Sequence, residues 1–358
     1  MTKKNNNTKQ LPFVSICTPT FNRRPFIPYA IKCFEHQTYP KERMEWIIID
    51  DGTDKIEDLV SHIPQVKYFK YDTKMYLGKK RNVMHDNSKG DIIVYMDDDD
   101  YYPPDRVQHA VDTLLANPDA LCAGSSAMDI YFKHIQQMYR FGPYGPKHST
   151  AATFAFKREL LKQTRYDDNA ALAEEKSFLK DYTIPFVQLD PLKSILVFSH
   201  IHNSFDKKTL LTGKETPFIK LSTITVDEYV KEPDIKKFFM EDIDELLNNY
   251  DPGKPEHKPE VLDQIKDLSE KREIMKKQHQ EKMMEYQKML NNDPNIINLV
   301  KKLNEQDAYI KQIVKENQVL KDKANYFENK IKQLLTAKVE ERKKELIVAK
   351  ENTNDFVI

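Results

Sequence analysis

GDIIVYMDDDDYYPP, residues 90–104, contains a short apolar run that ends in four consecutive aspartates at 97–100. The run at 91–96 has the length and composition of a buried strand. Four adjacent carboxylates repel one another, so a buried strand that ends in them needs a compensating positive charge. In open α/β sheets, ligands bind outside the carboxyl ends of the strands. We therefore expect these acids at a binding site rather than on a solvated surface.

Short apolar runs alternate with amphipathic stretches on both sides of this motif. That alternation is typical of an α/β domain with a mixed, mostly parallel sheet. The predicted strands lie at 13–18, 45–50, 66–71, 91–96, 120–131 and 195–202. The predicted helices lie at about 26–37, 53–61, 78–88, 104–116, 157–163 and 174–182.

Polar residues follow three of the predicted strands. The first strand runs into PTFNRR (19–24), the second into Asp51 and Gly52, and the fourth into the aspartates at 97–100. Because parallel strands end at one edge of a sheet, these groups should converge there. Two carboxylates can share Mg²⁺ or Mn²⁺, and the cation can in turn hold a pyrophosphate.

These motifs together resemble family 2 glycosyltransferases. VSICTPTFNRRPFI (14–27) is similar to the opening strand of that family, and WIIIDDGTDK (46–55) to its second strand. LGKKRNVMHDNSKGDIIVYMDDDD (77–100) resembles its Gly-x-x-Arg-Asn helix and the strand that carries the Asp-x-Asp motif. The resemblance covers residues 11–205 and implies the GT-A fold, a Rossmann-like nucleotide-binding half merged with an acceptor-binding half.

The resemblance implies a binding site for the donor nucleotide. Pro19, Thr20 and Phe21 would lie along the base, with Phe21 where the family often has Tyr. Asp51 would accept a hydrogen bond from the uracil N–H. Arg81 would contact the base or the phosphates.

It also implies the metal site. Asp97, Asp98 and Asp99 would form the Asp-x-Asp motif, with Asp99 the main metal ligand. Asp97 or Asp98 would reach the ribose hydroxyls, or the metal through water. Asp100 would be a structural or acceptor-side acid. The repeated aspartates also allow the register 98–100.

Two further groups complete the predicted site. ALAEEKSFLKDY (171–182) supplies the acidic pair Glu174 and Glu175, and the resemblance selects Glu175 as the general base that takes a proton from the acceptor hydroxyl. The family's usual residue there is Asp. In ILVFSHIHNS (195–204), His202 matches the family's metal-binding His, and His200 stands where the family often has Arg.

The function that follows is metal-dependent transfer of a sugar from a nucleotide-sugar donor, most often UDP-linked, to a hydroxyl acceptor. The resemblance implies a hexosyltransferase-type single displacement with inversion at the anomeric carbon, with Mn²⁺ or Mg²⁺ as cofactor. The acceptor could be a glycan, a protein or a lipid-linked sugar.

The bulk composition excludes several partners. The chain has 358 residues with 56 basic and 56 acidic side chains, so no net charge directs it to nucleic acid or an anionic membrane. No run of 18 apolar residues predicts a membrane span, and the start MTKKNNNTKQ lacks a signal-peptide core. Its three cysteines show no metal-ligand spacing and suggest buried thiols in a reducing compartment. We expect a cytoplasmic protein.

Composition also divides the chain. We expect a disordered N-terminus at 1–10, the GT-A domain at 11–215, a helical extension at 216–250, a Pro-rich linker at 251–260, long coiled-coil helices at 261–350 and a tail at 351–358.

The long-helix segment carries a heptad repeat. With Leu303 at position a, the other a positions hold Ile310, Asn317, Ala324 and Ile331, and the apolar d positions hold Ile313, Leu320, Phe327 and Leu334. Only Gln306 interrupts the d row. This narrow stripe, with one polar Asn at a, predicts a coiled coil that favours a homodimer. A single charged helix folded back on the catalytic domain is the alternative.

Two other functions remain open. A nucleotidyltransferase also uses strand-end aspartates and a metal, although TPTFNRR lacks the glycines of its usual loop. A catalytically weak glycosyltransferase-like scaffold would act through the coiled coil. A nucleic-acid role is disfavoured, because lysines in the last third alternate with glutamates.

Overall fold

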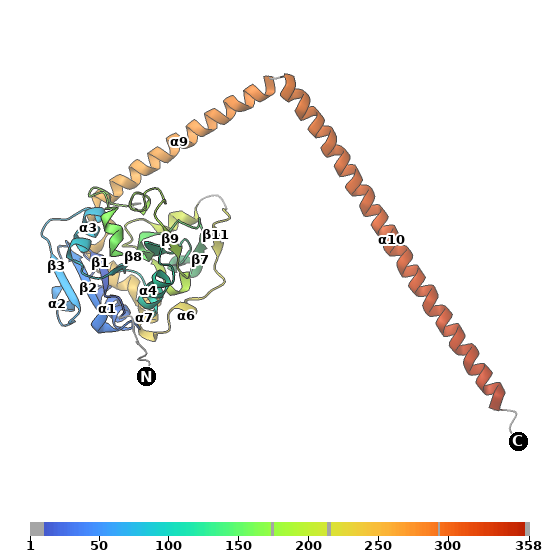
Figure 1. Cartoon of the computed structure of the whole chain (residues 1–358), viewed down its shortest axis with the longest axis horizontal. Helices are drawn as coiled ribbons and strands as arrows, with labels where there is room; N and C mark the ends of the chain where they lie inside the picture. The colour runs from blue at the N-terminus through green and yellow to red at the C-terminus, as the bar shows by residue number, and fades with distance from the viewer. Residues whose placement is uncertain (1–10, 173–174, 213–215, 293, 355–358) are drawn as a thin grey trace, which may run out of the picture. The chain divides into compact units, whose positions relative to one another are not determined.

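The computed structural model describes residues 11–172, 175–212, 216–292 and 294–354 (Figure 1). The chain divides into two compact units, residues 1–270 and residues 271–358. The disorder predicted for residues 1–10 concerns residues outside these described ranges. The first unit contains every strand of the two sheets described below.

A seven-stranded sheet forms the centre of the first unit. Its strands are β1 (Val14–Thr20), β2 (Met44–Asp50), β3 (Val66–Lys70), β4 (Ile92–Tyr95), β5 (Cys122–Gly124), β8 (Ala155–Lys157) and β9 (Phe186–Gln188). They lie in the order β3-β2-β1-β4-β8-β5-β9. All neighbours are parallel except β8, which runs antiparallel to β4 and β5. The predicted mixed, mostly parallel α/β sheet is confirmed.

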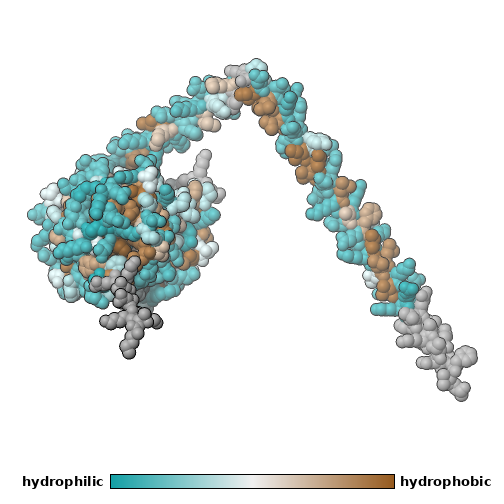
Figure 2. Space-filling model, in the orientation of Figure 1, coloured by the Kyte–Doolittle hydropathy of each residue, from teal (hydrophilic) through white to brown (hydrophobic). Residues whose placement is uncertain are grey.

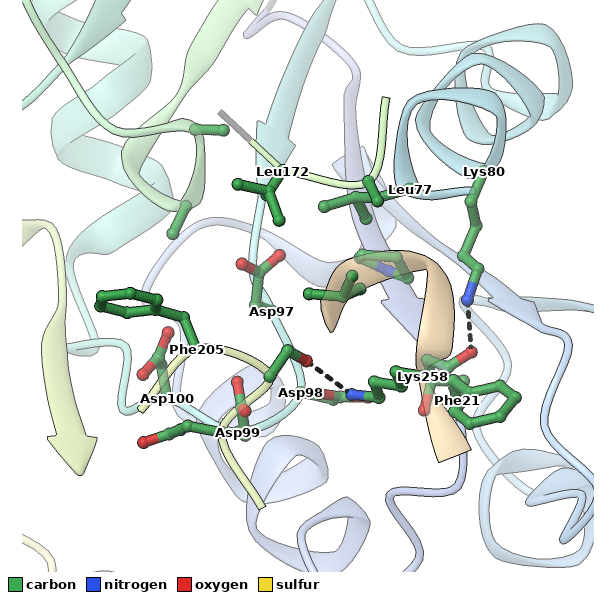
Figure 3. A pocket seen from close by; sticks show the side chains of 18 of the residues that line it. Phe21, Leu77, Lys80, Asp97, Asp98, Asp99, Asp100, Leu172, Phe205 and Lys258 are labelled. Atoms are coloured by element: carbon green, nitrogen blue, oxygen red, sulfur yellow. Dashed lines mark hydrogen bonds between the residues drawn. The ribbon is translucent and has the colours of Figure 1, made fainter. Parts of the chain in front are cut away.

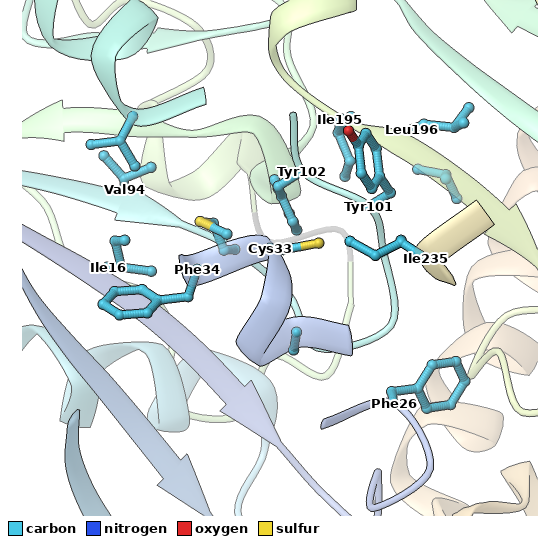
Figure 4. Close-up of a cluster of buried hydrophobic side chains, with 14 of the residues drawn as sticks. Ile16, Phe26, Cys33, Phe34, Val94, Tyr101, Tyr102, Ile195, Leu196 and Ile235 are labelled. Carbon is cyan, nitrogen blue, oxygen red and sulfur yellow. The ribbon is translucent and has the colours of Figure 1, made fainter. Parts of the chain in front are cut away.

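Helices cover both faces of this sheet, because successive side chains of a strand point to opposite faces. The helices are α1 (Ile27–Glu35), α2 (Glu57–Val60), α3 (Leu77–Asn87) and α4 (Arg106–Ala116). Ile16 of β1 packs in one core with Phe34 of α1, which Figure 4 shows. The next residue, Cys17, belongs to the opposite core with Met84 of α3. The three cysteines are free and buried.

A second sheet has the strands β6 (Met128–Phe132), β7 (Gln137–Phe141), β10 (Leu196–Ser199) and β11 (Ile219–Leu221), in the order β10-β6-β7-β11. The single strand predicted at 120–131 is in fact split between β5 and β6. Side chains interrupt it: the Ser125 N–H donates to Thr153 Oγ1 (2.9 Å), and the Ser126 N–H donates to Gln188 Oε1 (2.8 Å). The sequence pattern also missed β7, β8, β9 and β11.

Two predicted helices are shorter than expected. The segment at 157–163 is a 3₁₀ turn, Arg158–Lys162. The segment at 174–182 gives the four-residue helix α5 (Glu175–Phe178). Residues 180–182 have positive φ angles of 49° to 61°, which a right-handed helix cannot include.

The acidic segment at 216–250 folds onto the first unit. It contains β11, α6 (Val226–Tyr229), α7 (Pro233–Lys237), a π turn (Phe238–Asp242) and α8 (Ile243–Asn248). Its apolar residues join the main core, where the Phe239 ring stacks on Phe198 with centroids 4.2 Å apart.

Residues 251–260 do not form the free linker that the prolines predicted. They make two 3₁₀ turns, Asp251–Gly253 and Pro255–His257, that lie against the end of β1. Asn22 Nδ2 donates to the Pro252 carbonyl (2.9 Å), and Arg23 Nη1 donates to the Gly253 carbonyl (3.3 Å). A Cβ on Gly253 would come within 2.6 Å of the His202 ring, so only glycine fits this contact.

Two long helices follow, α9 (Pro259–Asn292) and α10 (Pro294–Asn354). α9 begins in the first unit, and the unit boundary falls after residue 270. The backbone of α10 stays helical into the predicted tail, of which residues 355–358 lie outside the described ranges. Over those ranges, the structure contains no helix whose length and apolar content would suit a bilayer crossing.

Candidate active site

A cavity of about 410 Å³ opens at the carboxyl ends of β1 and β4 (Figure 3). It collects residues from nine separate segments of the first unit. Most of the predicted site residues line it: Pro19, Thr20, Phe21, Arg81, Asp97, Asp98, Asp99 and Glu175. Residues that the sequence did not single out also line it: Arg23, Lys74, Lys80, Lys207 and Lys258. The cavity is thus lined by the aspartates on one part of its surface and by basic side chains, called the basic rim below, on another.

The four aspartates form the acidic part, directly after β4. Arg23 Nη2 lies 3.3 Å from Asp99 Oδ2, and Arg23 Nε lies 3.8 Å from Asp98 Oδ1. Asp98 and Asp100 are buried, and each has one carboxylate oxygen with no hydrogen-bond partner among the described residues. Arg23 alone therefore does not compensate the whole cluster.

Their different surroundings separate the pKa values of these acids. Burial, together with the Asp99 charge, raises the pKa of Asp98 to about 7 and that of Asp100 well above its usual range. Burial acts in the same direction on Asp99, but Arg23 and His200 outweigh it and hold the Asp99 pKa well below normal. Asp99 is therefore the acid of this cluster that stays ionised without further help.

The donor chemistry of this cluster fits a divalent cation. Mg²⁺ and Mn²⁺ prefer carboxylate oxygens, and buried oxygens without partners are where a cation would gain most. Within the described part of the chain, no three His, Cys, Asp or Glu side chains already lie in ligand geometry. The residues fit the chemistry of a metal site. A cation bound to these carboxylates would take its remaining ligands from another bound molecule.

Phe21 lies at the other end of the cavity, surrounded by lysines. The Nζ atoms of Lys74, Lys80 and Lys258 lie 4.3, 5.8 and 5.9 Å from the centre of its ring. Cation–π contacts of this kind stabilise both the ring and the ammonium groups. They place positive charge along the wall that Thr20 and Phe21 form.

Asp51 does not line the cavity. Its carboxylate pairs with Lys80 and accepts a hydrogen bond from the Met75 N–H (2.7 Å). Lys80 also donates to the Thr20 carbonyl (3.0 Å). Asp51 therefore positions Lys80 in this structure. Its predicted contact with the base of a nucleotide stays a prediction.

Arg81 lies in α3, with its guanidinium 4.4 Å from the centre of the Tyr95 ring. Glu175 begins α5 on the opposite wall, and its carboxylate accepts a hydrogen bond from the Ala151 N–H (3.1 Å). This contact holds Glu175 at the cavity that also contains the aspartates. Glu174, the other half of the predicted acidic pair, lies outside the described residues.

His202 differs from its prediction as a metal ligand. Its ring is buried away from the cavity lining, against Gly253 and 6.2 Å from the Tyr250 ring centre. His200 reaches the cluster instead, with Nε2 3.3 Å from Asp99 Oδ2. In the turn after β10, the His200 N–H donates to Asn203 Oδ1 (2.9 Å).

Comparison with known proteins shows what the first unit is similar to. Residues 15–174 match the model of the family described as glycosyl transferase family 2. This segment is therefore similar to that family. The match accounts for the order of the three strand-end motifs and confirms the GT-A fold that the sequence predicted.

Individual relatives are similar over part of the family 2 region. An uncharacterized glycosyltransferase of Haemophilus influenzae is 29% identical over 122 residues, which cover 33% of this chain and 48% of the relative. The poly(ribitol-phosphate) beta-N-acetylglucosaminyltransferase TarS of Staphylococcus aureus is 27% identical over 109 residues, 27% of this chain and 18% of TarS. This chain therefore spans at most about half the length of these curated relatives.

A crystal structure of S. aureus TarS residues 1–349 with UDP-GlcNAc is similar at 19% identity and a TM-score of 0.41. It covers 52% of this chain and 58% of the TarS chain.

The family 2 motifs could be found from sequence because each is a contiguous run. Arg23 was visible in PTFNRR but had no assigned role, and its partner Asp99 is 76 residues away. Lys258 lies in the Pro-rich segment, and no local pattern distinguishes it from the neighbouring lysines. Only the packing of that segment on the end of β1 brings Lys258 into the site.

Proposed function

We propose that this protein is a metal-dependent, inverting glycosyltransferase that uses a UDP-linked sugar as donor and a hydroxyl group as acceptor. One observation carries the proposal. A buried cluster of aspartates ends strand β4 of a family 2 segment and shares one cavity with Glu175 and a basic rim.

Asp99 and the unpartnered oxygens of Asp98 and Asp100 would hold Mn²⁺ or Mg²⁺, with Asp97 beside them. When bound, the cation would neutralise charge on the diphosphate leaving group. Arg23 and His200 keep Asp99 ionised, so this carboxylate is ready to bind a cation at neutral pH. His202 is not part of this proposal, since its ring faces the Pro-rich segment.

Glu175 would act as the general base. As the acceptor oxygen attacks the anomeric carbon, its proton passes to the Glu175 carboxylate and the bond from that carbon to the diphosphate oxygen breaks. Attack from the side opposite the leaving group inverts the configuration at the anomeric carbon. The Ala151 N–H donates to the Glu175 carboxylate and helps to orient it in the cavity.

The nucleotide would lie along the wall of Pro19, Thr20 and Phe21, with its phosphates toward the aspartates. Arg81 lines the same cavity and would contact the base or a phosphate. Asp51 would act mainly by positioning Lys80. If uracil displaced Lys80, the Asp51 carboxylate would instead accept a hydrogen bond from the uracil N–H. The sugar and the acceptor would meet between the aspartates and Glu175.

We also propose that α10 forms a coiled-coil homodimer. Its seam residues are exposed in the single chain, for example Ile310 at 57% and Leu320 at 61%. Charges beside the seam support a parallel, in-register pair. In that arrangement position g of one helix faces position e of the next heptad on the other helix. The three charged pairs are all attractive: Lys302 with Asp307, Glu316 with Lys321, and Lys323 with Glu328.

Calorimetric titration of the full chain with a panel of sugar nucleotides, in Mn²⁺ and in EDTA, tests the donor site. We expect one UDP-sugar to bind with Mn²⁺ and to lose most of its affinity in EDTA. Asp99→Asn should bind equally weakly in both buffers. Asp105→Asn, which changes an exposed acid just beyond the cluster, should behave like the wild type. Absence of nucleotide binding by the folded wild type would contradict the proposal.

A further inference from the structure

The segment at 251–264, between the globular fold and the free part of α9, forms one wall of the candidate active site. Three of its residues line the cavity: Lys258, Glu260 and Val261. In Figure 3 the short helical turn that carries Lys258 passes beside Phe21, over the mouth of the site.

Contacts at both ends hold this segment in place. Before Lys258, the Pro252 carbonyl accepts from Asn22 (2.9 Å), and the His257 carbonyl accepts from Lys74 Nζ (2.6 Å). After it, Glu260 pairs with Lys74 at 2.7 Å. Every one of these partners lies in or beside the cavity lining, so the segment is built into the site.

Further along α9, Gln264 bonds the loop that precedes Glu175. Its side-chain oxygen accepts from the Ala171 N–H (2.8 Å), and its side-chain nitrogen donates to the Asn169 carbonyl (2.7 Å). The segment at 251–264 therefore connects the nucleotide wall on one side with the Glu175 wall on the other.

Lys258 is a buried basic side chain in this wall, and burial first, then the Arg23 charge, lowers the pKa of its amine well below the usual value. It is only 8% exposed, and its Nζ donates one hydrogen bond, to Ser204 Oγ (2.8 Å). Among the described residues, no carboxylate lies within ion-pair distance of it. Lys80, the other buried lysine of the cavity, is already paired with Asp51. An ammonium group has three donors and is costly to bury without an anion.

We propose that Lys258 binds the diphosphate of the nucleotide donor, so that the segment leading into the C-terminal helices completes the donor site. Lys258 lies beside Phe21, on the wall where the nucleotide would bind. The acids of the same cavity would bind the metal. A diphosphate placed on that metal supplies the anion that Lys258 lacks. This inference rests on the proposed function and adds a specific contact to it.

The geometry distinguishes Lys258 from Lys254 in the same segment. Lys254 is 43% exposed on its side chain and pairs with Asp251 at 2.7 Å, outside the cavity. Each lysine directly follows one of the two 3₁₀ turns of this segment. Substituting Lys258 tests the phosphate contact, and substituting Lys254 tests whether a change of charge elsewhere in the segment affects binding.

The test is calorimetric titration of the full chain with UDP in Mn²⁺, for wild type, Lys258→Gln, Lys258→Arg and Lys254→Gln. Uridine affinity is measured by displacement. Loss of a charge-assisted phosphate contact should weaken UDP binding by about 10- to 100-fold in Lys258→Gln. Uridine affinity should change little, Lys258→Arg should retain part of the UDP affinity, and Lys254→Gln should match the wild type.

Two results would overturn the inference while leaving the proposed function intact. Unchanged UDP affinity in Lys258→Gln would exclude the phosphate contact. Equal loss of UDP and uridine affinity would mean that Lys258 only supports the wall. If the wild type bound no UDP, the proposed donor would itself be wrong. Fluorescence of Trp46, the single tryptophan, reports whether the first unit of each variant is folded.

Discussion

The two units of this chain depart from the usual distribution of side chains in opposite ways. The first unit buries ionisable side chains: Asp98, Asp100 and Lys258 are 7%, 9% and 8% exposed. Helix α10 exposes apolar surface: Leu303 and Leu320 are 57% and 61% exposed, and Figure 2 shows apolar residues along this helix. Charged groups are seldom buried without a partner, and extended apolar surface seldom stays in water.

Each departure indicates the chemistry that would compensate it. The buried ionisable groups of the first unit suit small ions and charged ligands that can enter a cavity. The exposed stripe of α10 suits another apolar helix, as in the proposed coiled coil. The first unit is thus the proposed site for a small molecule and α10 the proposed site for a protein partner, and each proposal can be tested separately.

The largest expected effect is in the acids that line the cavity. Glu175→Gln keeps an oxygen that can accept from the Ala151 N–H but removes the basic carboxylate. We expect kcat to fall by about 10²- to 10⁴-fold, since that is the usual contribution of a general base. UDP affinity should stay within about twofold of the wild type, because the ligand-binding wall is unchanged. Initial rates with the donor found by calorimetry, together with a UDP titration, measure both.

Glu159→Gln is the matched control, since Glu159 is an exposed glutamate on the 3₁₀ turn Arg158–Lys162. It should transfer sugar at the wild-type rate. Wild-type turnover in Glu175→Gln would remove Glu175 as the base and would leave its place in the cavity lining without a catalytic explanation.

The next effect concerns the exposed stripe. Leu320→Glu places a charge at a seam position, and Val319→Glu places the same charge on the neighbouring residue outside the seam. Val319 is also exposed, at 48%. Loss of two buried leucines per dimer should weaken association at least about 30-fold. Sedimentation velocity should show a monomer for Leu320→Glu at concentrations where Val319→Glu is a dimer.

Charge exchange sharpens the same prediction. Glu316→Lys alone would face Lys321 of the second helix and should weaken a parallel dimer. Adding Lys321→Glu should restore it. An antiparallel pair does not bring these two positions together, so absence of rescue would argue against the parallel register. A wild-type chain that sediments as a monomer would return α10 to the single-helix alternative.

The smallest effect is on stability and comes from a buried group that stays neutral. Burial first, and then the Arg81 charge, lowers the pKa of His85 to about 3. Its Nε2 lies 2.6 Å from the Tyr95 hydroxyl. The unfolded chain binds this proton near pH 6.5, so His85 favours the folded state above that pH. This contribution is lost as pH falls from about 6.5 toward 3.

Urea unfolding followed by Trp46 fluorescence at pH 7.5, 6 and 5 measures this dependence for the first unit. For His85→Gln the free energy of unfolding should depend less on pH than in the wild type, by up to about 1.4 kcal/mol per pH unit. Parallel curves for the two proteins would show that His85 is not the group responsible.

Contiguous patterns predicted the central fold well. β1, β2 and β4 are short apolar runs buried on both faces, and the polar residues that follow them reach one edge of the sheet because the strands are parallel. The same reasoning predicted the acids of the cavity, while the family resemblance selected Glu175, which also lines it. It could not locate β8, a three-residue antiparallel strand whose partners lie far away in the sequence.

The two histidines after β10 show the limit for site residues. Both follow β10 within three positions, and only the folded structure shows that His200 lies 3.3 Å from Asp99 whereas His202 does not line the cavity. The role of residues 251–260 was missed for a related reason. Proline and glycine usually mark a linker, but here they let the backbone approach Asn22 and His202 closely.

That close approach limits how the molecule can be divided or recombined. A protein shortened at residue 255 would lose Lys258 together with the Glu260 and Gln264 contacts, whereas one that ends at residue 270 would keep the whole first unit. Any exchange of the C-terminal helices for another segment must therefore retain about three turns of α9. The boundary between the two units falls inside a helix, and the Pro-rich stretch belongs to the first unit.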